Sequence, residues 1–217
     1  MKKVLLFALV MFFGAAAFAQ DAPVVQLPKV QIVGDFSYIY AQQYGFIPSY
    51  EPKGGGGSIA YFFNKHIGLL ADFQYYGSQT FDFSVPALTQ GCNSPSPCPL
   101  RVEGNAFSYN LGPVLRFRFK RVEPFAEFLF GGVHNQAYGN LYNDCLHQGE
   151  CLNLARQPND NAFDLVIGGG VEIPISGHFS IRAAQVDFMP THFGTSLAIS
   201  NSTQDNLRFQ AGLVFRF

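Results

Sequence analysis

The chain has 217 residues, of which 16% are aromatic and only 13% are charged. An average globular chain carries roughly 25% charged residues, so this composition lacks the charge expected of a surface that faces water everywhere. Without Lys2 and Lys3, which we assign below to a signal sequence, the 14 basic residues fall to 12 against 15 acidic ones, and a net charge of −3 excludes the basic surface of a nucleic-acid-binding protein.

The N-terminus has the organisation of a secretory signal sequence. Lys2 and Lys3 form its basic region, residues 4–13 form its apolar core, and Ala17-Phe18-Ala19 matches a small-residue cleavage site. The apolar core is too short for the roughly 20 residues of a membrane-spanning helix, and no longer apolar run follows it. We therefore expect residues 1–19 to be a signal peptide, export through the Sec pathway, and a mature domain at residues 20–217.

The four cysteines form two pairs with equal spacing in two polar stretches, Cys92 with Cys98 and Cys145 with Cys151. In an exported chain, two local disulfides are the simplest interpretation. A metal site that uses His147 is a weak alternative, because one histidine between two cysteines is too few ligands at metal-binding spacing. We expect disulfides, and neither a metal nor another cofactor.

The mature sequence alternates apolar and polar residues with a period of two, which is typical of β-strands. In chain order the predicted strands are 30–40, 58–64, 67–76, 107–119, 124–134, 162–173, 179–188 and 207–217. The alternation slips near Gln185 and Asp187, which predicts a β-bulge, and Gly131-Gly132 is a candidate bulge or bend.

The connections between these strands alternate in length. Long polar stretches at 41–57, 77–105, 135–161 and 189–204 alternate with short turns at 65–66, 120–123 and 175–178, and Gly54 to Gly57 is predicted to be a flexible run within the first of the long loops. Long loops at one end and short turns at the other are the layout of transmembrane β-barrels, whose tilted strands need roughly 9–11 residues to cross.

The alternative is a soluble barrel whose apolar face points inward. Three observations favour the membrane: the mature lysines Lys29, Lys53, Lys65 and Lys120 avoid strand interiors, aromatic residues lie towards strand ends, and the polar face carries small residues that suit a narrow lumen, namely Gly68, Ser108, Gly112, Gly168, Gly170, Ala184 and Gly212. We predict an all-β fold, an eight-stranded antiparallel up-and-down transmembrane β-barrel with its apolar face on lipid.

This arrangement places a set of acidic and basic residues, balanced in number, inside the barrel: Asp35, Asp72, Arg116, Arg118, Glu127, Asp164, Glu172, Arg182, Arg208 and Arg216. The short turns predict that Arg116 lies opposite Glu127 and that Glu172 lies opposite Arg182, where opposite charges attract across a ladder. Paired charges predict a lumen plugged by salt bridges. The alternative is a narrow passive, porin-like channel for ions or small solutes.

Known catalytic arrangements fit this sequence poorly. His178-Phe179-Ser180 matches the His-x-Ser letters of lipid A deacylases, but it lies in a predicted periplasmic turn, far from the outer leaflet. Proteases resembling omptins need ten strands and paired acids at the barrel mouth, which are lacking here. His134 and His192 could face each other at the rim near Asp187, although ordinary polar residues explain them more simply. We predict no enzymatic activity.

The final residues, Gly212-Leu213-Val214-Phe215-Arg216-Phe217, end the printed sequence on an aromatic side chain. With the eight alternating strands, this ending resembles the outer-membrane β-barrel domains of the OmpA/OmpX type. The resemblance implies a bacterial outer-membrane location, an assembly signal at Phe215 and Phe217 that the barrel-assembly machinery reads, and periplasmic chaperones during biogenesis.

The resemblance also implies a monomer in contact with outer-membrane lipid and lipopolysaccharide. The implied role is structural or surface-interacting, in envelope integrity or adhesion, with the loops as the variable part. Unlike full-length OmpA, the sequence shows no peptidoglycan-binding domain after the barrel, so a cell-wall tether is not expected.

Overall fold

The computed structural model describes residues 28–42, 51–85, 98–136, 161–193 and 202–217. The strands are β1 (Val30–Ala41), β2 (Lys53–Phe62), β3 (Ile67–Val85), β4 (Cys98–Arg116), β5 (Glu123–Asn135), β6 (Asn161–Pro174), β7 (Phe179–Phe193) and β8 (Ser202–Arg216). Each strand pairs with the next, and β1 pairs antiparallel with β8 to close the barrel. The predicted eight-stranded up-and-down barrel is confirmed. The described residues contain no helix long and apolar enough to cross a membrane.

The two faces of the barrel wall differ in chemistry as the alternation predicts. On the outside, Phe36 is 58% exposed and Phe130 is 51% exposed. On the inside, Gln74 and Arg208 are both 0% exposed. A soluble barrel would have the opposite arrangement, so the apolar exterior is a lipid-facing surface.

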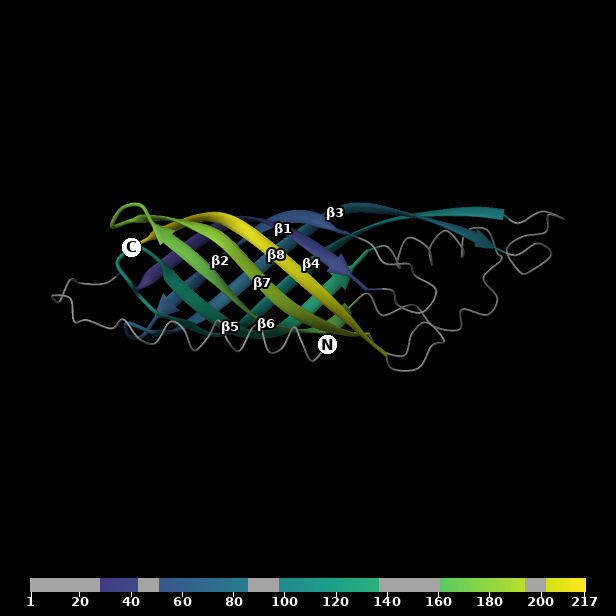
Figure 1. Cartoon of the computed structure of the whole chain (residues 1–217). Coiled ribbons are helices and arrows are strands. Elements are labelled where there is room, and N and C mark those ends of the chain that lie inside the picture. Colours follow the sequence, from purple (N-terminus) through teal and green to yellow (C-terminus); the bar gives the residue numbers. More distant parts are fainter. Residues whose placement is uncertain (1–27, 43–50, 86–97, 137–160, 194–201) are drawn as a thin grey trace, which may run out of the picture.

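The connections divide the barrel into two ends (Figure 1). The turn end carries the short connections 63–66, 117–122 and 175–178, and the loop end carries the connections 42–52, 86–97, 136–160 and 194–201. Phe217 and Val30 exchange backbone hydrogen bonds of 2.9 and 3.1 Å at the turn end, which closes the seam between the last and first strands. In transmembrane barrels the short turns face the periplasm.

The glycine run Gly54 to Gly57 belongs to β2, so the prediction of a flexible loop there is wrong. Gly57 pairs with Gly34 of β1 and Phe73 of β3, and the run is in register on both sides. A Cβ at Gly54 would lie 2.0 Å from the backbone oxygen of Tyr75. These glycines therefore permit a close approach of neighbouring backbones, and pairing on both sides orders a segment of low intrinsic strand preference.

β3 and β4 are longer than predicted and form a two-stranded ribbon that projects past the other strands at the loop end (Figure 1). Residues 79–85 pair with residues 98–104 in this ribbon, and Cys98 lies opposite Val85. Cys92, Cys145 and Cys151 lie outside the described residues, as does the predicted signal peptide. Both disulfides and the signal peptide stay predictions.

The predicted irregularity in β7 is confirmed. The pairing of β7 with β8 shifts between Arg182 and Gln185, so Ala183 and Ala184 are both exposed and the two flanking side chains are both buried. Ala184 therefore faces outward, not into the lumen as expected. The bulge changes the parity of the strand, which turns Gln185 and Asp187 inward.

Gly131-Gly132 is not a bulge. Both residues pair in register with β4, Gly131 with Asn110 and Gly132 with Tyr109. A Cβ at Gly131 would lie 1.9 Å from the Tyr109 backbone oxygen and 2.6 Å from Asn110 Oδ1. Gly131 therefore provides room for a neighbouring strand and an inward-facing side chain.

Candidate functional site: the charged lumen

The short turn after β4 is centred one residue earlier than predicted, and this corrects one of the two predicted ion pairs. Arg116 pairs with Phe125, and Glu127 pairs with Val114. The turn closes through hydrogen bonds from Phe117 N to the Pro124 oxygen at 2.9 Å and from Phe119 N to the Val122 oxygen at 3.2 Å. β5 therefore begins at Glu123, and the register differs by two residues from the expected one.

Three arginines surround Glu172 near the turn end. Arg182 lies directly opposite Glu172, as predicted, with 2.9 Å between Nη2 and Oε1. Arg216 Nη2 lies 2.8 Å from Glu172 Oε2, and Arg116 Nη2 lies 3.4 Å from the same oxygen. Glu172 is 0% exposed. A buried carboxylate of this kind requires paired cations, because an unpaired charge would be costly to remove from water.

Glu123 and Gln31 complete this group, which we call the Glu172 cluster: Glu172, Glu123, Arg116, Arg182, Arg216 and Gln31. Glu123 lies opposite Glu172 in the ladder, and Arg216 separates the two like charges with Nη2 2.6 Å from Glu123 Oε2. Gln31 donates from Nε2 to Glu172 Oε1 at 2.8 Å and accepts from Arg116 Nη2.

Two inward-facing phenylalanines pack against guanidinium faces of the Glu172 cluster. The Arg116 guanidinium carbon lies 4.2 Å from the centre of the Phe62 ring, and that of Arg182 lies 4.6 Å from the centre of the Phe125 ring. Cation–π contacts of this kind are stronger where water is excluded. The phenylalanines therefore fill the lumen and fix the orientation of the arginines.

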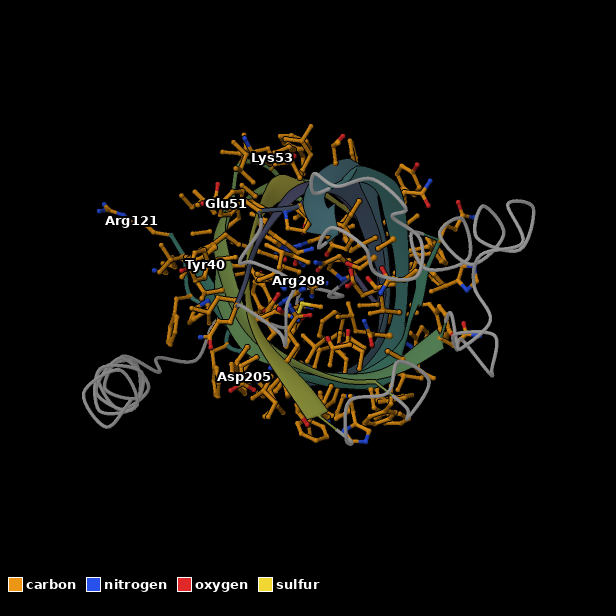
Figure 2. All side chains as sticks on the ribbon, turned by 90° about the vertical axis from the view of Figure 1, so that its right-hand side faces the viewer. Tyr40, Glu51, Lys53, Arg121, Asp205 and Arg208 are labelled. Carbon is orange, nitrogen blue, oxygen red and sulfur yellow. The ribbon has the colours of Figure 1, made fainter. Side chains whose placement is uncertain are left out.

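The next layer of the lumen has the opposite arrangement, one arginine among three carboxylates. Arg208 Nη1 lies 2.6 Å from Asp72 Oδ2, its Nε lies 2.8 Å from Asp187 Oδ2, and its Nη2 lies 3.6 Å from Glu127 Oε1. We call these four residues the Arg208 cluster. Figure 2 looks along the barrel from the loop end and shows Arg208 in the interior, among side chains that fill the lumen.

Gln185 joins the two clusters. Its Oε1 accepts from Arg182 Nη1 at 2.7 Å, and its Nε2 donates to Glu127 Oε1 and Asp187 Oδ2, both at 2.9 Å. The amide oxygen of Gln185 thus contacts a guanidinium of the Glu172 cluster, and its amide nitrogen contacts carboxylates of the Arg208 cluster. This contact exists because the β7 bulge places Arg182 and Gln185 on the same face.

The remaining predicted lumen residues lie at the edges of these clusters. Gln74 donates from Nε2 to Asp35 Oδ1 at 2.8 Å and to Asp72 Oδ1 at 3.0 Å. Asp164 accepts from Thr191 Oγ1 at 3.1 Å and from Asn110 at 3.3 Å.

Arg118 lies in the turn after β4 and not among the clustered charges. It is half-buried and donates from Nη2 to the Pro28 oxygen at 3.3 Å. Partial burial lowers the pKa of its guanidinium. Arg118 therefore anchors the segment before β1 to the turn end of the barrel.

Sequence reasoning missed Glu123 and Asp187, and both change the charge balance. Glu123 was expected in a turn, and Asp187 was expected near the rim. With them, the described interior holds five arginines (Arg116, Arg118, Arg182, Arg208, Arg216) and seven carboxylates (Asp35, Asp72, Glu123, Glu127, Asp164, Glu172, Asp187). The slip in alternation at Gln185 was the signal for Asp187. The lumen is acidic, not balanced.

The histidines do not form a catalytic set in the described structure. β6 lies between the two rim histidines, since Asn161 of β6 pairs with His134 and Phe163 of β6 pairs with His192. Asp187 is buried in the lumen instead of lying beside them. His178 donates to the Arg216 oxygen at 3.0 Å in a turn-end contact. No group of three or more metal-ligating side chains occurs among the described residues.

A closed barrel with a lipid-facing exterior, a polar lumen and short turns at one end has the architecture of bacterial outer-membrane β-barrels. Residues 5–217 match the family described as outer membrane protein beta-barrel domain, and the chain belongs to this family. The protein is therefore an outer-membrane β-barrel. Phe215 and Phe217 are 46% and 66% exposed at the turn end, and their role as an assembly signal stays a prediction.

Solved structures show the same fold at low sequence identity. Neisserial surface protein A is 11% identical with a TM-score of 0.54, and the match covers 87% of this chain and 97% of that one. The outer membrane protein OprG from Pseudomonas aeruginosa is 10% identical with a TM-score of 0.51, over 91% of this chain and 99% of that one. No curated protein matches the sequence.

Proposed function

We propose that the protein is a structural and surface-interaction component of the outer membrane, with a sealed lumen and no enzymatic activity. The observation that carries this proposal is the fully buried Arg208, which is held by carboxylates from β3, β5 and β7. These contacts span the lumen, and an eight-stranded barrel is narrow enough for side chains to fill. Interaction with other molecules is then left to the exterior and the loop end.

The β3–β4 ribbon supports the surface-interaction part of the proposal. β2 pairs with β3 only as far as Tyr76, and β5 pairs with β4 only as far as Ala106, so the described ribbon continues without those neighbours. Projecting strands present unpaired backbone groups at their edges, and segments beyond a rigid scaffold are common places for binding. The ribbon therefore extends the barrel on the side that would face the cell exterior, where a binding partner would be reached.

The experiment compares the full chain with a shortened ribbon. Gln79 lies opposite Gly104, so an Asn-Gly turn can join these two residues and leave the barrel register intact. Both proteins are produced in a bacterial strain that lacks its own small outer-membrane β-barrel proteins. Two quantities are measured: adhesion of the cells to surfaces coated with matrix proteins, and permeability of the envelope to a dye that an intact outer membrane excludes.

We expect both proteins to restore the permeability barrier and only the full chain to support adhesion. Equal adhesion by both proteins would contradict the surface-interaction role. A dye permeability that neither protein changes would contradict the structural role.

The remaining partners belong to the same proposal. The protein would be exported through the Sec pathway, be inserted by the barrel-assembly machinery with the help of periplasmic chaperones, and remain a monomer in contact with lipid and lipopolysaccharide. The exposed Phe215 and Phe217 support the assembly signal, because they stand at the seam where the barrel closes.

A narrow passive channel is the second candidate, and the excess of carboxylates in the Arg208 cluster favours it. Three carboxylates around one guanidinium attract cations, as acidic rings do in cation channels. Potassium release from vesicles that contain the refolded protein, in preference to chloride release, would support this candidate. A sealed lumen predicts release at the rate of protein-free vesicles.

A further inference from the structure

The turn end carries a set of exposed cations. Lys29 precedes β1, Lys65 lies in the first turn, and Lys120 and Arg121 lie in the second, all four exposed. Among the described residues of this end, the acidic side chains are Glu123 and Glu172, both buried and both paired with Arg216, at 2.6 and 2.8 Å. We call Lys29, Lys65, Lys120 and Arg121 the turn-end collar.

The loop end has the opposite sign in its described part. Among the side chains that the structure describes there, Glu51 and Asp205 stand against Lys53. The exterior of the molecule is therefore electrically polarised along the barrel axis, with its cations on the side of the short turns. Figure 2 shows Glu51, Lys53 and Asp205 around the wall as seen from the loop end.

The collar lies beside lipid-facing apolar side chains. Phe63 and Ile67, which flank Lys65, are 65% and 44% exposed. Val122, which follows Arg121, is 43% exposed. Figure 2 shows that Arg121 extends outward from the barrel wall, away from the axis. Long basic side chains in such positions cover apolar surface with their stems and place their charge at the headgroup level.

We propose that the turn-end collar binds the phosphate groups of anionic phospholipids in the periplasmic leaflet. The sideways direction of Arg121 and the apolar flanks favour a lipid over a soluble partner below the barrel. Each cation near an anionic membrane surface strengthens association by about five-fold, so four cations distinguish anionic from zwitterionic lipid. This proposal is independent of what the loop end binds.

The test is native mass spectrometry of the full chain, refolded with equal amounts of phosphatidylglycerol and phosphatidylcholine that have the same acyl chains. The wild type is expected to retain phosphatidylglycerol preferentially. The K65Q/R121Q variant is expected to lose this preference by roughly 25-fold, because two of the four cations are removed at about five-fold each. The K53Q/R101Q variant removes the same two residue types at the loop end and is expected to keep the preference.

Heat-modifiable gel mobility establishes that each variant is folded, and the single variants K65Q and R121Q replace the double variant if it fails to fold. An unchanged lipid preference in the folded turn-end variants would overturn the proposal. A wild type without lipid preference that sediments with insoluble peptidoglycan would also overturn it, in favour of an anionic wall polymer.

Discussion

At the residue scale, Glu172 and Arg208 are centres of opposite type. Glu172 is surrounded by arginines, and Arg208 is surrounded by carboxylates. Both are 0% exposed. Such a site affects stability less through the attraction within one ion pair than through the cost of breaking it. A buried charge that loses its partner is strongly destabilising. Removal of either centre therefore leaves several like charges facing one another.

The first prediction concerns Arg208. Arg208→Met keeps a long side chain but leaves Asp72, Glu127 and Asp187 without their shared cation. We expect the free energy of unfolding, measured by urea titration in lipid vesicles, to fall by about 3–5 kcal/mol. The matched control, Arg121→Met, removes an exposed arginine and should cost less than about 1 kcal/mol. A loss at position 208 as small as that at position 121 would contradict the account.

At the element scale, the β7 bulge builds the lumen. It places Arg182 and Gln185 on the same face, and it turns Asp187 towards Arg208. If the strand continued from Arg182 in regular alternation through all of these residues, Gln185 and Asp187 would lie on the lipid face. A charge on that face near the bilayer centre is costly, so the bulge determines whether β7 can occupy a membrane at all.

The second prediction concerns this bulge. Deletion of both Ala183 and Ala184 places Gln185 directly after Arg182 and turns Gln185 and Asp187 to the lipid face, so we expect the refolded chain to lose the heat-modifiable band of a closed barrel on gels. Deletion of Ala183 alone leaves one outward residue between Arg182 and Gln185, keeps Asp187 in the lumen and should retain that band. A heat-modifiable double-deletion variant of wild-type stability would contradict this account.

The element scale also shows why the sequence predicts some features and not others. Alternation is local, so it predicted every strand and the confirmed pairing of Glu172 with Arg182 across a short turn. The register at the other turn depended on which two residues form its tip, and an error of two positions misplaced Arg116 relative to Glu127. The order in Gly54 to Gly57 comes from strands on both sides, which residue preferences do not report.

Contacts across the lumen were beyond sequence reasoning for a different reason. Arg208 and Asp72 are 136 residues apart and Gln31 and Glu172 are 141 residues apart, and each pair lies on two strands that do not pair with each other. Such contacts depend on the curvature of the closed barrel and on side-chain length. The sequence therefore identified ten interior charges but, apart from the Glu172–Arg182 pair, not their partners, and it missed the two whose positions depend on a turn and a bulge.

At the scale of the whole molecule, the barrel has three distinct regions. The lumen is filled by two clusters joined through Gln185, the turn end is basic among its described residues, and the loop end extends into the β3–β4 ribbon. A filled lumen assigns rigidity to the interior and leaves interaction to the two ends. This division is the central claim, because an open lumen would make transport the main function.

Single-channel recording in planar bilayers tests that claim most directly. The Glu127→Gln variant replaces one carboxylate of the Arg208 cluster with an amide, whose oxygen can still accept the hydrogen bond that Gln185 Nε2 donates. Because side chains span the lumen in both proteins, we predict no unitary conductance steps from the wild type or from the variant. Reproducible steps in the wild type that change in size or ion selectivity in Glu127→Gln would contradict the sealed lumen and establish a channel.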